Sequence, residues 1–166
     1  MAWFEEKIIA HGNKRELSEM NWKVISDIYP NHGPIGGIHA VLSVCKSDAL
    51  FIVTCDMPLL KSSLAQKLCD IMCESEDASR TVEGTVSDHV VYDAVIAVEE
   101  DGKVHPLCGV YRKSALPILE EQILSDRNKM MSVLEKLHVK YMTVDSSIET
   151  QQLWNINTPQ DYKKLT

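Results

Sequence analysis

The run Ala49–Cys55 constrains the fold more than any other stretch, because it is almost continuously apolar. A strand without alternating apolar and polar residues is typical of parallel sheets, in which helices cover both faces. Apolar residues recur at helical spacing before it, at Ile35, Ile38, Leu42 and Cys45. A second helical segment is expected from Ser62 to Cys73. The sequence therefore predicts a central strand between two helices.

Further short apolar runs predict the remaining strands. They lie at residues 7–10, 23–25, 90–98, 104–111 and 139–144. The turn signal at Asp101 and Gly102 favours a β-hairpin, and Pro106 indicates an edge strand or a bulged one. Strands that alternate with helices are typical of α/β proteins. We expect an α/β fold with a three-layer, Rossmann-like, mostly parallel sheet and an antiparallel strand or hairpin excursion, formed by a single domain over residues 1–166.

Helix signals continue through the second half of the chain. Ser114 is expected to cap one helix, and residues 128–137 form another with Met131 on its inner face. Thr158, followed by proline, is expected to cap a last helix. Residues 74–89 are polar and have no clear period, which predicts a surface loop.

Composition and charge argue against several classes of function. The 166 residues carry a net charge of −7 and are 45 % hydrophobic. Binding to nucleic-acid phosphates needs clustered Lys and Arg, so nucleic acid is not expected as a partner. Residues 1–7 resemble no signal peptide, and no run approaches the ~18 apolar residues of a membrane span. We expect a cytoplasmic protein without a membrane partner, whose five cysteines are free thiols.

A glycine-rich turn, Gly33-Pro34-Ile35-Gly36-Gly37, opens the helix that precedes the apolar strand. The first backbone N–H groups of a helix have no intrahelical partner and lie at the positive end of the helix dipole, so they favour an anion such as phosphate. Glycines before a helix more often serve tight packing or a positive φ angle. Because of their place at the helix start, Gly33, Gly36 and Gly37 are nonetheless candidates for nucleotide binding.

Two carboxylates follow predicted strands. Asp56 comes directly after Ala49–Cys55, and Asp27 follows the short strand at 23–25. Ligands of open α/β sheets bind beyond the carboxyl ends of the strands, where Asp56 could hold Mg²⁺ against phosphate oxygens. The alternatives are that Asp56 caps the helix expected from Ser62 and that Asp27 forms a turn.

Five segments, taken in order, resemble the molybdenum cofactor guanylyltransferase family, the MobA-like nucleotidyltransferases. They are Val24-Ile25-Ser26-Asp27, Gly33-Pro34-Ile35-Gly36-Gly37-Ile38, Cys55-Asp56-Met57-Pro58, His105-Pro106-Leu107-Cys108-Gly109-Val110-Tyr111-Arg112 and Asn155-Ile156-Asn157-Thr158-Pro159-Gln160-Asp161. The resemblance runs from about residue 7 to the C-terminus. Each motif is modest alone, whereas five in this order make a specific match.

The resemblance implies transfer of GMP from MgGTP to a molybdopterin cofactor, with release of pyrophosphate. By position, it implies that Asp27 contacts the guanosine and that Asp56 binds Mg²⁺ between the phosphates. It places Asn155 and Asn157 near the pterin side of the cleft. Phosphoryl transfer depends mostly on positioning and charge neutralisation, so one metal-bearing carboxylate can matter more than any nucleophile on the protein.

The sequence departs from the family pattern near its start. The family opens with a glycine-rich loop of the form LAGGxSxRMGxDK, which grips the triphosphate and supplies a Lys, and residues 1–20 do not match it. At His11 the family tends to place an Asn near the nucleotide, which leaves Asn13 as the substitute. We expect a domain of this family that is truncated at its N-terminus and by itself binds GTP weakly or not at all.

Two other functions remain open. One is a related transferase that uses CTP on molybdopterin or acts on a sugar phosphate, since base choice resides partly in the unmatched loop. The other is a non-catalytic module that binds molybdopterin or docks on a molybdenum-insertion protein. Comparing GTP with CTP binding separates the first alternative, and cofactor binding without nucleotide turnover would favour the second.

Overall fold

The computed structural model describes residues 6–11, 22–80, 90–144 and 151–163. Within them, four strands form one sheet in the spatial order β3 (Ala49–Val53), β5 (Val104–Arg112), β4 (Ala94–Glu99) and β6 (Val139–Val144). β5 is antiparallel to both of its neighbours, whereas β4 and β6 are parallel. Two further strands, β1 (Ile8–Ala10) and β2 (Lys23–Ile25), pair in parallel as a separate sheet.

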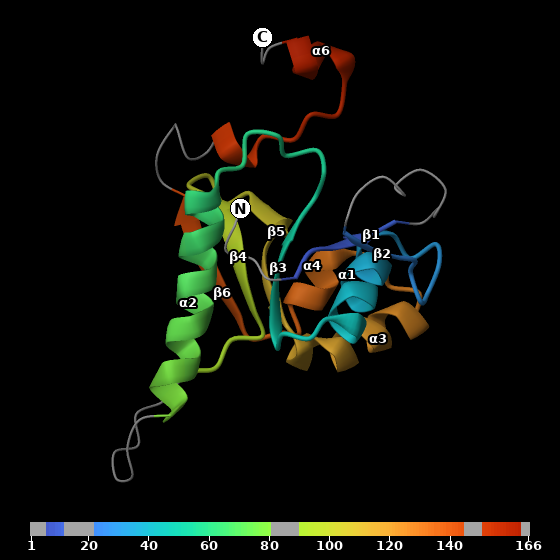
Figure 1. Cartoon of the computed structure of the whole chain (residues 1–166), viewed down its shortest axis with the longest axis vertical. Helices are drawn as coiled ribbons and strands as arrows, with labels where there is room; N and C mark the ends of the chain where they lie inside the picture. The colour runs from blue at the N-terminus through green and yellow to red at the C-terminus, as the bar shows by residue number, and fades with distance from the viewer. Residues whose placement is uncertain (1–5, 12–21, 81–89, 145–150, 164–166) are drawn as a thin grey trace.

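Helices cover the four-stranded sheet on both faces (Figure 1). The long helix α2 (Ser62–Arg80) lies on one face, and α1 (Gly33–Val44), α3 (Leu116–Leu124) and α4 (Met130–Leu134) lie on the other. Shorter helical turns are η1 (Lys113–Ala115), η2 (Gln151–Leu153) and α6 (Pro159–Lys163). The expected three-layer α/β fold with one antiparallel strand is confirmed. Among the helices of the described ranges, none combines the length and the apolar character that crossing a membrane requires.

The core on the α1 face forms as the helical periodicity predicts. The stripe Ile35, Ile38, Leu42 and Cys45 is buried, with each side chain at most 5 % exposed. These residues belong to one cluster with Tyr111 of β5 and Leu119 of α3. The phenol of Tyr111 is fully buried and donates a hydrogen bond to the Pro106 carbonyl oxygen at 2.6 Å, so its burial leaves no unpaired hydroxyl.

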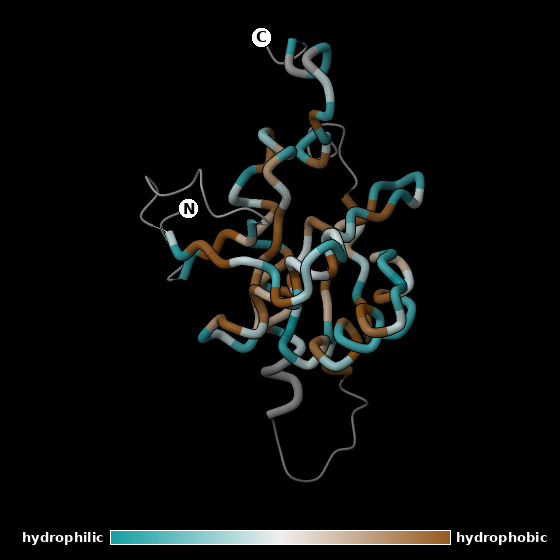
Figure 2. The backbone as a smooth tube through the Cα atoms, turned by 90° about the vertical axis from the view of Figure 1, so that its right-hand side faces the viewer, coloured by the Kyte–Doolittle hydropathy of each residue, from teal (hydrophilic) through white to brown (hydrophobic). Residues whose placement is uncertain are grey.

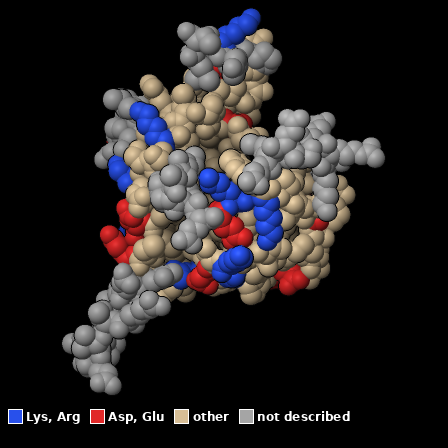
Figure 3. Space-filling model, viewed as in Figure 1, with Lys and Arg blue, Asp and Glu red and all other residues tan. Residues whose placement is uncertain are grey.

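A second core fills the opposite face of the sheet. Leu64, Leu68 and Met72 of α2 lie in one cluster with Val95 of β4 and Val110 of β5. Figure 2 shows the hydrophobic positions gathered in the middle of the molecule and the hydrophilic ones on the outer turns. Acidic and basic side chains lie side by side on the face seen in Figure 3, where the described residues form no extended basic patch.

The apolar strand β3 differs in one respect from the expectation of a central strand. Helices α1 and α2 contact it from its two faces, as expected. In the described part of the chain, however, it pairs only with β5 and lies at the edge of the four-stranded sheet. Its residues are therefore partly exposed rather than buried, and β4 and β5 form the sheet's centre.

The β4–β5 hairpin is confirmed, and its proline lies at a bulge. Gly102 in the turn has a φ of +88°, which favours glycine. The register of β4 with β5 shifts between Ile96 and Ala97, whose partners are Gly109 and His105. Pro106 falls within this shift, so a central strand accommodates a residue that cannot donate a hydrogen bond to the ladder. The bulged-strand alternative is correct, and the edge-strand alternative is wrong.

Three helix predictions need correction. Helix α2 runs on to Arg80, so the polar stretch expected to be a loop is helical over its first residues. Polar residues do not prevent a helix whose outer face is solvated. The predicted inner residue Met131 is 44 % exposed, and its neighbour Met130 is buried instead.

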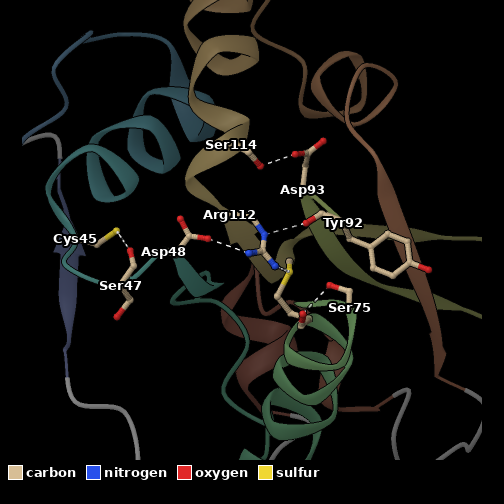
Figure 4. Close-up of polar contacts among 9 residues, drawn as sticks. Cys45, Ser47, Asp48, Ser75, Tyr92, Asp93, Arg112 and Ser114 are labelled. Carbon is tan, nitrogen blue, oxygen red and sulfur yellow. Dashed lines mark hydrogen bonds and ion pairs between the residues drawn. The ribbon is translucent and has the colours of Figure 1, made fainter. Parts of the chain in front are cut away.

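Ser114 does not cap a helix. It lies in η1, and α3 begins two residues later at Leu116, with Ala115 at its N-cap. The Ser114 hydroxyl donates its hydrogen bond to the carboxylate of Asp93 (Figure 4). The Ser114 hydroxyl, which the local sequence predicted to cap a helix, is therefore used in a hydrogen bond to a residue distant in sequence.

A buried arginine ties the strands together at the end where β3 and β4 begin. Arg112, the last residue of β5, donates from its guanidinium to the Asp48 carboxylate at 2.9 Å and to the Tyr92 carbonyl oxygen at 3.2 Å (Figure 4). Asp48 directly precedes β3, and Tyr92 lies two positions before β4. These bonds fix the amino ends of two strands to the carboxyl end of the third.

The tip of the β4–β5 hairpin holds Glu99 in its charged form. Its Oε1 accepts a hydrogen bond from Lys103 Nζ at 2.9 Å and lies 2.6 Å from Nε2 of buried His105. Burial alone would raise the pKa of Glu99, but the hydrogen bonds from Lys103 and His105, together with their charges, leave that pKa below its usual value. A depressed pKa stabilises the fold above the unfolded-state pKa, and this contribution is lost as the pH falls through the folded-state pKa.

We expect Glu99→Gln to lower the free energy of unfolding by about 1 kcal/mol at pH 7, because two charge-assisted hydrogen bonds weaken. The difference from the unchanged protein should shrink at acidic pH, as the pH falls through the lowered pKa of Glu99 and the carboxylate becomes protonated. Urea unfolding at pH 7 and at acidic pH measures it. Glu121→Gln is the control, because Glu121 and Lys136 form an exposed ion pair that contributes little. A loss of the same size at both pH values would contradict the role of the charge.

Candidate functional site

The order of the elements brings the candidate segments to one end of the molecule. β2 leads through residues 26–32 into α1, and α1 leads into β3. Because α1 runs back along the sheets, its first turn lies at the carboxyl end of β2, and β3 ends on that same side. Ligands of open α/β sheets bind at this end. Asp27, the glycine turn and Asp56 therefore share one edge of the fold.

Asp27 lies against the first turn of α1. One carboxylate oxygen is 3.5 Å from the position that a Cβ would take at Gly36, and the other is 3.9 Å from the same position at Gly37. Ala10, the last residue of β1, approaches Gly37 to a similar distance, 3.6 Å from the Cβ position. The ends of β1 and β2 and the start of α1 thus meet around one half-buried carboxylate. Its contact with a nucleotide stays a prediction.

The three glycines of the turn are not equivalent. Gly33 has a φ of +56°, a conformation that L side chains rarely adopt. Gly36 is buried, and the carbonyl oxygen of Tyr29 lies 2.9 Å from the position of its missing Cβ. Gly37 makes only ordinary contacts there, so packing does not require a glycine. The N-cap residue, His32, makes no side-chain capping bond, which leaves the first amides of α1 without a side-chain cap.

A methyl group at each position tests this difference. Gly36→Ala forces the Tyr29 carbonyl away from α1, and we expect the free energy of unfolding to fall by about 1–3 kcal/mol. Gly37→Ala is the matched control, since it fits without displacement and gains up to about 1 kcal/mol of helix propensity. Urea denaturation compares the two variants. Equal stability would contradict the close approach at Gly36.

Asp56 lies in the turn after β3 and is held on two sides. The Thr54 hydroxyl donates a hydrogen bond to its Oδ1, and the backbone N–H of Ile156 donates to its carbonyl oxygen at 2.8 Å. α2 begins only at Ser62, so the alternative in which Asp56 caps that helix is wrong. The first contact fixes the plane of the carboxylate, and the second fixes its backbone against the C-terminal segment.

The C-terminal segment brings one of its two candidate asparagines to this point. Asn155 directly precedes Ile156, and its side-chain Oδ1 is buried without a hydrogen-bond partner in the described structure. A buried acceptor without a partner costs free energy, and such groups mark places where a ligand or water completes the bonding. Asn157 is exposed and precedes Thr158, whose hydroxyl accepts the Asp161 N–H bond that caps α6. The predicted cap is thus confirmed.

A metal at this site would need ligands from outside the protein. Within the described ranges, no group of three or more His, Cys, Asp or Glu side chains is placed to hold a metal ion. Mg²⁺ commonly binds through one or two carboxylates together with substrate phosphates and water. The single carboxylate of Asp56 therefore fits Mg²⁺ that arrives with a nucleotide. Asn13, the other candidate for nucleotide binding, lies outside the described residues.

Two histidines near the candidate site have structural partners. His105 is 6 % exposed and faces Glu99. Nδ1 of His32 lies 2.7 Å from Oδ1 of Asn128, in the segment between α3 and α4. These contacts account for both side chains as parts of the scaffold.

Some contacts that shape the site could not be read from the sequence. Thr54, two residues before Asp56, has the spacing of a hydroxyl that bonds a nearby carboxylate, and this local signal was available. The hydrogen bond from the Tyr29 hydroxyl to Glu120 Oε1, at 2.6 Å, joins residues 91 positions apart. No local pattern could have predicted that pair.

Comparison with known proteins identifies the class of fold and site. Residues 2–141 match the family described as MobA-like NTP transferase domain. A relative from Clostridium perfringens (strain SM101 / Type A), "Probable molybdenum cofactor guanylyltransferase", is 31 % identical over 168 residues, which covers 98 % of this chain and 76 % of the relative. The similarity thus extends over nearly the whole chain.

Two solved structures have a similar fold. Molybdopterin-guanine dinucleotide biosynthesis protein A from Archaeoglobus fulgidus superposes with a TM-score of 0.71 at 26 % identity, over 95 % of this chain and 75 % of that one. A protein from Aquifex aeolicus VF5 gives a TM-score of 0.73 at 22 % identity, over 93 % and 72 %, and shows the fold alone. The chain belongs to the MobA-like NTP transferase family. The family predicted from the motifs is confirmed.

Proposed function

We propose that this chain acts in molybdenum cofactor biosynthesis, transferring GMP from MgGTP to a molybdopterin cofactor and releasing pyrophosphate. The observation that carries the proposal is that Asp27 lies against the first turn of α1, while Asp56 follows the carboxyl end of β3 at the same end of the fold. Relatives at about this level of similarity bear the name molybdenum cofactor guanylyltransferase, as in Clostridium perfringens at 31 % identity. Family and site support the same reaction.

The proposal gives each candidate residue one task. Asp27 contacts the guanosine, and the backbone of Gly33, Gly36 and Gly37 lies along the nucleotide. Asp56 holds Mg²⁺, which neutralises phosphate charge when it is bound. Asn155, with its unpaired Oδ1, and Asn157 face the pterin. None of these residues is a nucleophile, which suits a reaction in which the acceptor attacks and the protein positions both substrates.

The grip on the triphosphate is the weakest part of this chain's site. No stretch of the 166 residues matches the glycine-rich loop with its lysine. We assign the base and metal sides of the cleft to Asp27 and Asp56, with Asn13 as a further nucleotide contact. Since no such loop supplies backbone N–H groups and a lysine to the triphosphate, we expect MgGTP binding that is weak but specific. We place the reaction in the cytoplasm, where GTP and Mg²⁺ are abundant. The product would then be delivered to a molybdenum-insertion protein.

Nucleotide titration followed by NMR tests the proposal, because it measures weak dissociation constants. We expect millimolar rather than micromolar binding of MgGTP, with GTP preferred over CTP. Asp56→Asn should remove the dependence on Mg²⁺, because the metal loses its protein ligand, and Asp27→Asn should reduce the preference for GTP.

Asp70→Asn is the control for these two variants. Asp70 is exposed on α2, away from the candidate site, so its substitution should leave both properties unchanged. Micromolar affinity would contradict the weak site, and Mg²⁺ dependence that survives Asp56→Asn would contradict the role of that carboxylate. Absence of any GTP binding by the unchanged chain would contradict the proposed nucleotide site.

A further inference from the structure

The loop between β2 and α1 is tied to a distant part of the chain. The Tyr29 hydroxyl donates a hydrogen bond to Oε1 of Glu120 in α3 at 2.6 Å. His32, at the end of the same loop, lies 2.7 Å through Nδ1 from Oδ1 of Asn128. Both partners belong to the α3–α4 part of the fold, more than 90 residues away in sequence. The loop therefore has two anchors outside its own neighbourhood.

The Tyr29 side chain is fixed by more than its hydroxyl. Its ring is partly buried against the α1-side core and meets the ring of His39 edge to face, with centroids 5.1 Å apart. The hydrogen bond to Glu120 raises the pKa of Tyr29, so the phenol keeps its proton and remains a donor. Glu120 is exposed, and only Tyr29 connects it to the loop in the contacts of the described residues. The hydrogen bond between Tyr29 and Glu120 can thus be removed without removing a buried side chain from the core.

The anchored residue is linked directly to the candidate nucleotide site. Asp27 lies two positions before Tyr29, and the Tyr29 carbonyl rests on Gly36, 2.9 Å from the Cβ position. Ile28 between them is 53 % exposed and holds nothing in the core. The place of Asp27 is therefore set by the end of β2 on one side and by Tyr29 on the other.

We infer that Tyr29 and Glu120 are positioning residues for guanine-nucleotide recognition, holding Asp27 at the first turn of α1 before the nucleotide arrives. This inference rests on the proposed function. If the loop is already ordered in the free protein, nucleotide binding does not have to supply the free energy that ordering it would cost. Helix α3, which supplies no residue to the predicted site, thereby determines how well the site selects its base.

Substitutions at the two ends of the Tyr29–Glu120 hydrogen bond separate its effect from that of the packing around Tyr29. Tyr29→Phe removes the hydroxyl and keeps the ring, and Glu120→Ala removes the acceptor. We expect each to weaken MgGTP binding about 3- to 10-fold, the value of one hydrogen bond. The double variant should be no weaker than either single one, because both remove the same bond. Glu120→Gln keeps an acceptor oxygen and should restore near-normal binding.

The matched control is Glu121→Ala. It removes an acidic side chain one position further along α3, whose partner is Lys136 rather than the loop. We expect normal MgGTP binding from it. ATP binding is the second comparison, since misplacing Asp27 should reduce affinity for GTP and leave the weaker binding of ATP unchanged. A general loss of stability would instead weaken the binding of GTP and of ATP alike.

Amide hydrogen exchange of residues 26–32, measured without nucleotide, tests the tie independently of the proposed function. Faster exchange there in Tyr29→Phe and Glu120→Ala, but not in Glu121→Ala, is expected. Unchanged exchange or unchanged GTP selectivity in both variants would overturn the inference. If the unchanged chain binds no GTP, the nucleotide role fails together with the proposed function, and the exchange data still decide whether the tie holds the loop.

Discussion

The approach of one backbone to another at Gly36 is the constraint on which the candidate site depends. The Tyr29 carbonyl can rest on α1 only because no side chain stands at that position. This contact sets the path of the loop after β2 and, through it, the place of Asp27. Gly33, with its positive φ, turns the chain into the helix just before. Two glycines thus determine where a carboxylate stands.

Local patterns in the sequence predicted most of the elements, because burial imposes periodicity. The stripe from Ile35 to Cys45 is one example. The cap at Thr158 was predicted from a different local signal, a Thr followed by Pro at a helix start. Predictions failed where a tertiary partner decides, as at Ser114, whose hydroxyl bonds Asp93 instead of a helix end. The candidate site residues were predicted from a helix start, from strand ends and from the order of motifs, whereas the Tyr29–Glu120 bond joins distant positions and leaves no periodic signal.

Buried polar groups at the two ends of the four-stranded sheet differ in whether they have hydrogen-bond partners. At the amino ends of β3 and β4, the buried Arg112 is bonded to Asp48 and Tyr92. At the carboxyl end of β3, beside Asp56, the buried Oδ1 of Asn155 has no partner within the described residues. Satisfied groups make an end rigid and stable, while unsatisfied ones are tolerated where a ligand binds. The unpaired oxygen of Asn155 thus lies at the end of the sheet where the candidate site is expected.

The hydrogen bond from Ile156 to Asp56 also has a consequence for the order of events during protein synthesis. Asp56 is made early, whereas its backbone partner belongs to the segment near residue 156 of 166. Chains emerge from the ribosome N-terminus first, at about 5–20 residues per second. The surroundings of Asp56 are therefore completed only after a further 100 residues have been translated, so a shorter nascent chain cannot present the finished candidate site.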